Sequence, residues 1–199
     1  MTDLSISQTA VFLIIATYFI GAIPFGLVFS SWLTGKDPRD FGSGNIGATN
    51  ALRTGGKAVG ILTLLADLLK GTLPVWLALE LGFHQLEVAL VALTAFLGHI
   101  FPVYLKFRGG KGVATMFGVL IPWLPWVALI SFAIWLISYK MSRYVSLASI
   151  LAGLVLPGLA WSFGASLEAL VSCMILGGLM IIRHQTNIKR LIEGTETRP

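Results

Sequence analysis

Charged residues are scarce in this chain. Only 12% of its 199 residues are Asp, Glu, Lys or Arg, whereas 56% are hydrophobic, and the mean hydropathy is +0.85. A water-soluble domain of this size has too small an interior to bury so much apolar surface. The composition therefore excludes a soluble protein and predicts an all-α integral membrane protein whose main partner is the lipid bilayer.

Cysteine is almost absent, and several catalytic signatures are missing. Cys173 stands alone in an apolar segment, which excludes an intramolecular disulfide and a cysteine-cluster metal site and favours a packing role. The HxxxxD signature of one large acyltransferase class, HExxH, GxSxG and GxxxxGK[ST] do not occur. There is also no carboxylate cluster of the kind that a CDP-alcohol phosphotransferase needs. We therefore expect no metal, no cofactor and no nucleotide hydrolysis.

Apolar segments predict seven transmembrane helices, at about residues 7–33, 58–80, 87–105, 112–121, 123–139, 144–161 and 165–182. A helix needs roughly 20 residues to cross a hydrocarbon core of about 30 Å. The fourth helix is short, since it reaches only about 15 Å before Pro122 and Pro125 interrupt it. The first basic residue, Lys36, follows the first apolar segment, so we expect that segment to be a retained helix and not a signal peptide.

The basic residues favour this seven-helix topology. With the N-terminus outside and the C-terminus cytoplasmic, every Lys and Arg except Lys70 falls on the cytoplasmic side. Merging residues 112–139 into one crossing would place Lys140, Arg143 and the basic tail outside. The formal charge of +5 is therefore read as an orientation signal, with no nucleic-acid partner. We predict a single transmembrane domain, residues 1–199, with cytoplasmic loops at about 34–57, 106–112 and 183–199.

The first cytoplasmic loop has the composition of a binding loop. It is long for a connection in so compact a protein, and long loops tend to be functional. Glycines allow successive amides to face one anion, while short polar side chains and a cation supply further contacts. A flexible linker is the alternative. The candidate residues of this loop are Gly42, Ser43, Gly44, Asn45, Thr49, Asn50 and Arg53.

The second cytoplasmic loop, residues 106–112, leads directly into the fourth helix. Its sequence, KFRGGKG, brings Lys106, Arg108 and Lys111 to the positive end of that helix, where free amides also suit a phosphate. Gly109, Gly110 and Gly112 are candidate substrate-binding residues. The alternative is that these cations only anchor the helix ends to anionic lipid, which is as good an explanation for Arg108.

Five further polar residues sit near the cytoplasmic side. In the tail, His184 and Asn187 are i and i+3 neighbours if the helix continues, so they are candidates for joint action, although an interfacial histidine is often only amphipathic. Asp67 and Lys70 have the same spacing and predict a structural ion pair inside the bundle. His99 fits either a core position or a site wall.

Three motifs resemble those of a known family, the bacterial acyl-phosphate:glycerol-3-phosphate acyltransferases of the PlsY type. They are FGSGNIGATNALRTGG at 41–56, GHIFPVYLKFRGGKGVAT at 98–115 and RHQTNIKRLIEGTE at 183–196. The resemblance covers essentially the whole chain. It implies Ser43, Arg53, Lys111, His184 and Asn187 as catalytic residues.

The resemblance also implies a reaction and a location. An acyl phosphate gives its fatty acyl chain to the sn-1 hydroxyl of glycerol 3-phosphate, and lysophosphatidic acid and phosphate are released, which is the first step of phospholipid biosynthesis. No metal, thiol or CoA is implied, and Glu196 matches a glutamate with a structural role. The implied location is the bacterial inner membrane, with the active site on the cytoplasmic side. The resemblance does not determine the oligomeric state, and a monomer is compatible with it.

Physical reasoning gives these residues roles in that reaction. Arg53 and Lys111 would neutralise the leaving phosphate, while the Ser43 hydroxyl and the Asn187 amide would stabilise the oxyanion. The proton of the acceptor hydroxyl would go to His184 or to a substrate phosphate oxygen, and the sequence does not separate these two.

Two other function classes remain as alternatives. A small-anion transporter, for phosphate or an organophosphate, would also gather glycines and cations at one face, but it predicts polar residues through the whole membrane depth. A structural membrane subunit would leave the long first loop and the GGKG turn without a reason.

Overall fold

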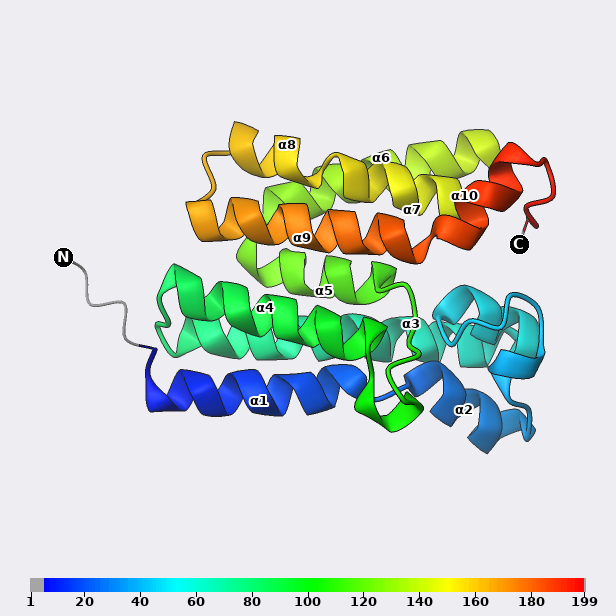
Figure 1. The fold of residues 1–199 in the computed structure, drawn as a ribbon, viewed down its shortest axis with the longest axis horizontal. Coiled ribbons are helices and arrows are strands. Elements are labelled where there is room, and N and C mark those ends of the chain that lie inside the picture. Colours follow the sequence, from blue (N-terminus) through cyan, green and yellow to red (C-terminus); the bar gives the residue numbers. More distant parts are fainter. Residues whose placement is uncertain (1–5, 199) are drawn as a thin grey trace.

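The protein is an all-helical bundle in the part of the chain that the computed structural model describes, residues 6–198. In chain order its helices are α1 (Gln8–Ala22), α2 (Phe25–Thr34), α3 (Ala48–Glu80), α4 (Gln85–Ile100), α5 (Val113–Trp123), α6 (Pro125–Ser142), α7 (Val145–Leu154), α8 (Leu156–Ser162), α9 (Leu167–Arg183) and α10 (Gln185–Ile192), with short 3-10 turns η1 (Pro38–Asp40) and η2 (Val103–Leu105). Most of these helices lie side by side along the long axis of the molecule (Figure 1).

Four helical stretches are long and apolar enough to cross a membrane: Ala48–Glu80, Gln85–Leu105, Pro125–Ser142 and Val145–Ser162. Two bent pairs raise this number to six if each pair is one span, namely α1 with α2, bent by 40°, and α9 with α10, bent by 57°. α5 has 11 residues and reaches only about 16 Å. Length and composition thus support four to six spans, and the seventh predicted crossing rests on this short helix.

Two predicted helix boundaries are wrong. The expected helix 7–33 is broken after Ala22, because Pro24 has no N–H to continue the helix. The expected helix 58–80 begins ten residues earlier, at Ala48, so the second half of the predicted loop 34–57 is helical. Gly56, with φ 83° and ψ −176°, interrupts this helix, and a glycine adopts that conformation without strain.

Glycines set the close approach of neighbouring helices. A Cβ built on Gly118 of α5 would lie 2.2 Å from the carbonyl oxygen of Leu68 in α3, and one on Gly71 of α3 would lie 2.7 Å from the carbonyl oxygen of Thr115. Small residues at such contacts let two helix backbones approach, which is the usual way in which membrane helices associate. α5 is therefore held tightly along α3.

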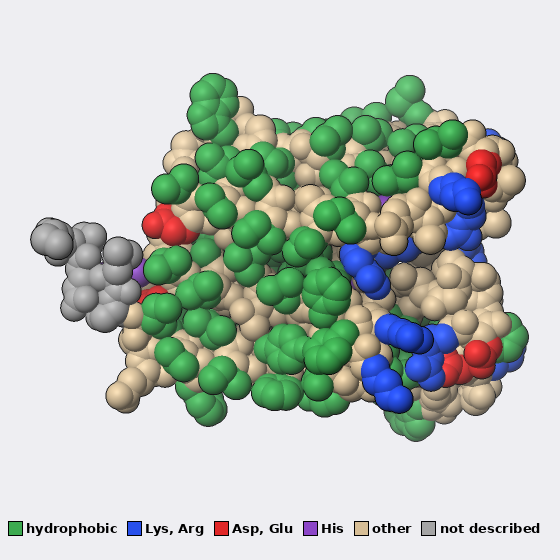
Figure 2. Space-filling model, in the orientation of Figure 1, with side chains coloured by type: hydrophobic (Ala, Val, Ile, Leu, Met, Phe, Trp, Pro, Cys, Tyr) green, Lys and Arg blue, Asp and Glu red, His purple; other side chains and the backbone are tan. Residues whose placement is uncertain are grey.

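Charged side chains gather at the two ends of the bundle. In Figure 2 the Lys and Arg side chains lie on the half of the molecule that carries α2, α10 and the loop between α2 and α3. The middle of the face shown is covered mainly by hydrophobic side chains. This separation is the one that the positive-inside rule predicts for a membrane protein.

The contact between α3 and α5 gives a stability prediction. We expect Gly118→Ala to destabilise the protein by about 1–3 kcal/mol, because the new methyl group overpacks the contact with Leu68. This corresponds to a fall in Tm of roughly 5 °C, measured by thermal unfolding in detergent. Gly178→Ala is the matched control, since a Cβ on this helical glycine meets nothing within 4 Å. An unchanged Tm for Gly118→Ala would contradict the close packing.

Candidate active site

A cavity of about 880 Å³ lies between α3, α5, α6 and α7 and extends under the first loop and the C-terminal tail. Its two parts differ in chemistry. The polar end is lined by Ser43, Asn45, Thr49, Asn50, Arg53, Lys111, Gly112, His184, Asn187, Arg190 and Glu196. The apolar groove is lined by Leu64, Leu65, Leu68, Phe117, Ile121, Leu129, Phe132 and Trp135.

The apolar groove opens toward the side of the bundle. Leu65 of α3 is 51% exposed and Leu129 of α6 is 55% exposed, although both line the cavity. α5 packs against both of these helices and forms the floor between them. An alkyl chain can therefore lie along α5 and still touch lipid, while its head group reaches the polar end.

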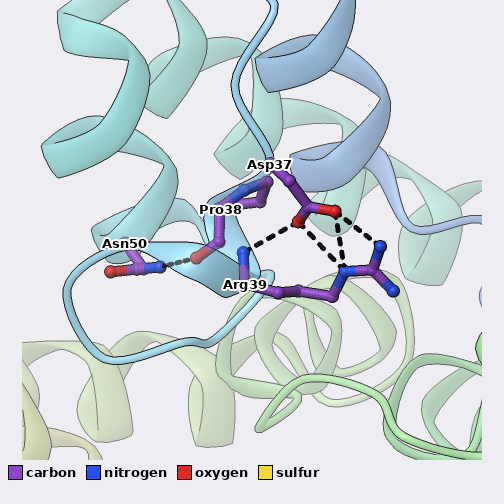
Figure 3. A network of polar contacts seen from close by, with 4 residues as sticks. All are labelled: Asp37, Pro38, Arg39 and Asn50. Atoms are coloured by element: carbon purple, nitrogen blue, oxygen red, sulfur yellow. Dashed lines mark hydrogen bonds and ion pairs between the residues drawn. The ribbon is translucent and has the colours of Figure 1, made fainter.

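The first loop is ordered by Asn50. Its Nδ2 donates to the carbonyl oxygens of Pro38 (2.7 Å), Phe41 (3.0 Å) and Asn45 (2.9 Å), and its Oδ1 accepts from the Ser43 amide (3.0 Å). Figure 3 shows the Pro38 contact beside the ion pair of Asp37 with Arg39. Because Asn50 is buried and its amide is used within the loop, it holds Ser43 at the rim of the cavity.

Two predicted glycines of this loop shape turns instead of lining the cavity. Gly42 and Gly44 have φ values of +57° and +67°, which favour glycine. A Cβ on Gly42 would also lie 2.3 Å from Oδ1 of Asn50. Their contribution to the site is therefore the path of the backbone around Ser43.

The second loop carries Lys111 to the N-terminus of α5. Gly112 is the N-cap, and no side chain among the described residues caps this end of the helix, so its free amides and the positive end of the dipole face the polar end. Lys106 and Arg108, the other two cations of the loop, are exposed and do not line the cavity.

Burial lowers the pKa of Lys111 to about 8. Glu196 opposes this shift, while Arg190, Arg53 and Arg183 add to it. A cation that loses solvation among other cations gains the most from an anionic ligand. The polar end is thus prepared for a phosphate group.

His184 is buried at the joint between α9 and α10. Its Nδ1 lies 2.8 Å from the carbonyl oxygen of Met180, and because a carbonyl only accepts, Nδ1 carries the proton. Burial and the charge of Lys111 lower the pKa of His184 to about 4. The ring is therefore neutral near pH 7, and its Nε2 is left as a hydrogen-bond acceptor.

Glu196 orients Asn187. Its Oε1 accepts from Nδ2 of Asn187 and from Oγ of Ser146, each at 2.7 Å, and its Oε2 lies 3.4 Å from Nε of Arg190. Because the amide nitrogen of Asn187 donates to this carboxylate, it is not directed at a substrate oxyanion as the sequence predicts. The buried Oδ1 of Asn187 has no partner among the described residues and is an acceptor, like Nε2 of His184. The tail that carries Glu196 also reaches Arg53, whose Nη2 donates to the carbonyl oxygen of Thr197 (3.4 Å).

Deeper in the bundle, the predicted ion pair of Asp67 and Lys70 is present. Nζ of Lys70 lies 2.7 Å from Oδ1 of Asp67 and also donates to the carbonyl oxygen of Ile23 (3.0 Å). Nδ1 of His99 lies 3.6 Å from the same carboxylate oxygen, and His99 and Asp67 both line the cavity. His99 is thus both a buried residue and part of the wall.

Sequence reasoning missed the roles of Arg183, Arg190 and Ser146. Ser146 and Arg190 line the cavity and contact Glu196, and Arg183 contacts the second loop. The partners of Ser146 and Arg183 are distant in sequence, so no local spacing could reveal them. The only sequence signal for Arg183 is its position directly before His184.

Comparisons with known proteins agree on one family. The profile of the family described as "Glycerol-3-phosphate acyltransferase" matches residues 11–194. The chain is 47% identical over 195 residues to the glycerol-3-phosphate acyltransferase of Bordetella pertussis (94% of this chain, 90% of that protein) and 43% identical over 189 residues to that of Methylobacillus flagellatus (95% and 96%).

Two crystal structures are also similar to this fold. One is PlsY, an integral membrane glycerol 3-phosphate acyltransferase, in its glycerol 3-phosphate form, with a TM-score of 0.92, 42% identity and coverage of 96% of both chains. The other is the lysophosphatidic acid form of the same kind of enzyme, with a TM-score of 0.89, 40% identity and coverage of 96% and 95%. The likeness extends over the whole bundle, so this chain is membrane-embedded as well.

The role of Asn50 gives a prediction about the first loop. We expect Asn50→Ala to raise amide hydrogen exchange across residues 41–47, most strongly at Ser43, because the acceptor for its amide is removed. Thr49→Ala is the matched control, because no hydrogen bond joins the Thr49 side chain to the described residues. Equal exchange in the two variants and the wild type would show that Asn50 does not order the loop.

Proposed function

The chain belongs to the glycerol-3-phosphate acyltransferase family, and from this premise we propose that it transfers a fatty acyl group from acyl phosphate to the sn-1 hydroxyl of glycerol 3-phosphate. The products are lysophosphatidic acid and phosphate. The observation that carries the proposal is the single cavity that joins a cationic polar end to an apolar groove.

The two parts of the cavity match the two parts of an acyl phosphate. Its phosphate suits the ammonium of Lys111 and the free amides at the N-terminus of α5, while its alkyl chain suits the apolar groove along the same helix. The guanidinium of Arg53 faces the same space. An acyl phosphate is a mixed anhydride, so it needs no further activation by a metal or a cofactor.

The acceptor end of the site suits a hydroxyl group. Nε2 of His184 and Oδ1 of Asn187 are both acceptors, and a glycerol hydroxyl can donate to either of them. The hydroxyl oxygen attacks the acyl carbon, the bond from that carbon to the phosphate oxygen breaks, and phosphate leaves with the bonding electrons. The cations at the polar end stabilise the charge that develops on it.

The proton of the hydroxyl is best taken by a phosphate oxygen. A catalytic base works best with a pKa near the working pH, and the second pKa of a phosphate group is about 6. The pKa of His184, about 4, makes its ring a weaker base. His184 then orients the hydroxyl, and the leaving or acceptor phosphate accepts the proton.

We further propose the topology and location. All seven apolar segments, the short α5 included, cross the inner membrane, with the N-terminus outside and the active site on the cytoplasmic side. The gathering of Lys and Arg at the end that holds the polar part of the cavity supports this orientation (Figure 2). We also propose that the protein works as a monomer, since residues of one chain line both the polar end and the apolar groove.

The reaction is tested by phosphate release from palmitoyl phosphate with and without glycerol 3-phosphate, in lipid without added metal. We expect release that depends on glycerol 3-phosphate, and analysis of the product should find the acyl chain at sn-1. Lys111→Ala and His184→Ala should lower kcat/KM by about 10²-fold or more, because each removes a group that faces the reacting atoms. Lys106→Ala, outside the cavity lining, is the control and should retain activity.

Two results would contradict the proposed reaction. One is no release above background from the wild-type protein. The other is movement of phosphate into proteoliposomes in place of acyl transfer, which would favour the small-anion transporter.

The lowered pKa of Lys111 predicts a pH dependence. Above pH 8 the free enzyme loses the ammonium charge, so kcat/KM for acyl phosphate should fall about tenfold per pH unit there. In Lys111→Arg the guanidinium stays charged, and this fall should disappear. At each pH, the kcat/KM of Lys111→Arg is divided by that of the wild type. Titration of the substrate affects both values equally and therefore cancels in this ratio. A fall of the same size in both proteins would assign it to another group.

A further inference from the structure

The second loop lies directly on the cytoplasmic end of α4. The Gly110 amide donates to the carbonyl oxygen of His99 (3.2 Å). A Cβ on Gly109 would lie 2.2 Å from that oxygen, and a Cβ on Gly110 would lie 2.1 Å from Nε2 of His99. Both glycines are therefore needed for the backbone to reach this position, although neither lines the cavity.

Arg183, from the last turn of α9, holds the same two glycines. Its Nη2 donates to the carbonyl oxygen of Gly109 (2.7 Å) and its Nε to that of Gly110 (3.1 Å). The guanidinium also lies 5.9 Å from the ring centre of Phe101, just beyond α4. Two donors in a rigid planar fork fix the orientation of two successive peptide groups, and the ammonium of a lysine does not reproduce that geometry.

The planarity of the peptide bond transmits this orientation to the cavity. The carbonyl and the N–H of a trans peptide point in opposite directions, and no described peptide is cis. Because the Gly110 carbonyl faces Arg183, the Lys111 amide points away from Arg183. Lys111, Gly112 and Val113 line the cavity and Arg183 does not. Their three amides have no acceptor among the described residues.

His99 itself is buried beside the ion pair of Asp67 and Lys70. Its Nδ1 lies 3.6 Å from Asp67, which is paired with Lys70. The loop is therefore held between His99 at the end of α4 and the guanidinium of Arg183 from α9.

We propose that Arg183 is a positioning residue: it turns the backbone of the Gly109–Gly112 segment so that the amides of Lys111, Gly112 and Val113 face the phosphate of the acyl donor. The inference rests on the proposed function. Arg183 itself touches neither substrate, and it acts through the loop. It also couples the second motif to His184, its neighbour in the third.

The test compares Arg183→Lys and Arg183→Ala with wild type in the palmitoyl phosphate assay, with kcat, KM and Tm measured for each. Arg183→Lys keeps the charge and loses the fork, so we expect kcat/KM to fall at least tenfold with Tm within about 2 °C of wild type, since small misplacement of a catalytic group has large effects on rate. In Arg183→Ala, added guanidinium ion should restore part of the activity, and urea at the same concentration should not. Arg143→Lys, at the exposed end of α6, is the control.

The outcomes separate this inference from the proposed function. If the wild-type protein releases no phosphate from palmitoyl phosphate, the proposed reaction fails. If the wild type is active and Arg183→Lys keeps its kcat and KM, the positioning role is wrong. A loss of activity that follows a fall in Tm and is not rescued by guanidinium would likewise overturn it, because Arg183 would then be only structural.

Discussion

The docking of the glycine loop on the end of α4 is the contact on which the rest of the site depends. Gly109 and Gly110 touch His99, and the chain then enters α5 at once, beside the buried Asp67, whose carbonyl oxygen accepts from Thr115 (3.0 Å). α5 therefore begins inside the bundle and not at its end. This position explains why the helix has only 11 residues. Its free N-terminus lies where the apolar groove and a group of cations meet.

Burial makes this site electrostatically strong. Cations and helix amides act on a phosphate more strongly in a poorly solvated cavity than in water. The same loss of solvation lowers the pKa of Lys111 in the protein without substrate. Glu196 limits the repulsion between the cations and also fixes the amide of Asn187. The same burial keeps His184 neutral, so its ring offers a lone pair close to the positive charge of Lys111 and the neighbouring arginines. In the proposed reaction, the two anionic substrates would be held at this one site with their reacting groups facing each other.

Much of this architecture follows from the sequence, because membrane spans and charge bias are local signals. The all-helical fold, the short fourth helix and the Asp67–Lys70 pair were predicted from apolar length, proline positions and i, i+3 spacing. The early start of α3 at Ala48 was missed because glycines and polar residues mask its first turns, and the break at Pro24 was hidden by continuous hydrophobicity. The contacts of Arg183 with Gly109 and of Glu196 with Ser146 join residues far apart in the chain, and no pattern in a single sequence encodes them. The motif positions indicated which residues share the site, and the three-dimensional packing determines which of them support the others.

A crystal structure with a non-hydrolysable phosphonate analogue of palmitoyl phosphate would show directly whether the N-terminus of α5 binds the phosphate of the acyl donor. We expect the phosphonate within hydrogen-bonding distance of Nζ of Lys111 and of the amides at the start of α5, with the alkyl chain along Phe117 and Phe132. A phosphonate bound away from this helix end, or a chain lying outside the groove between α3 and α6, would contradict it.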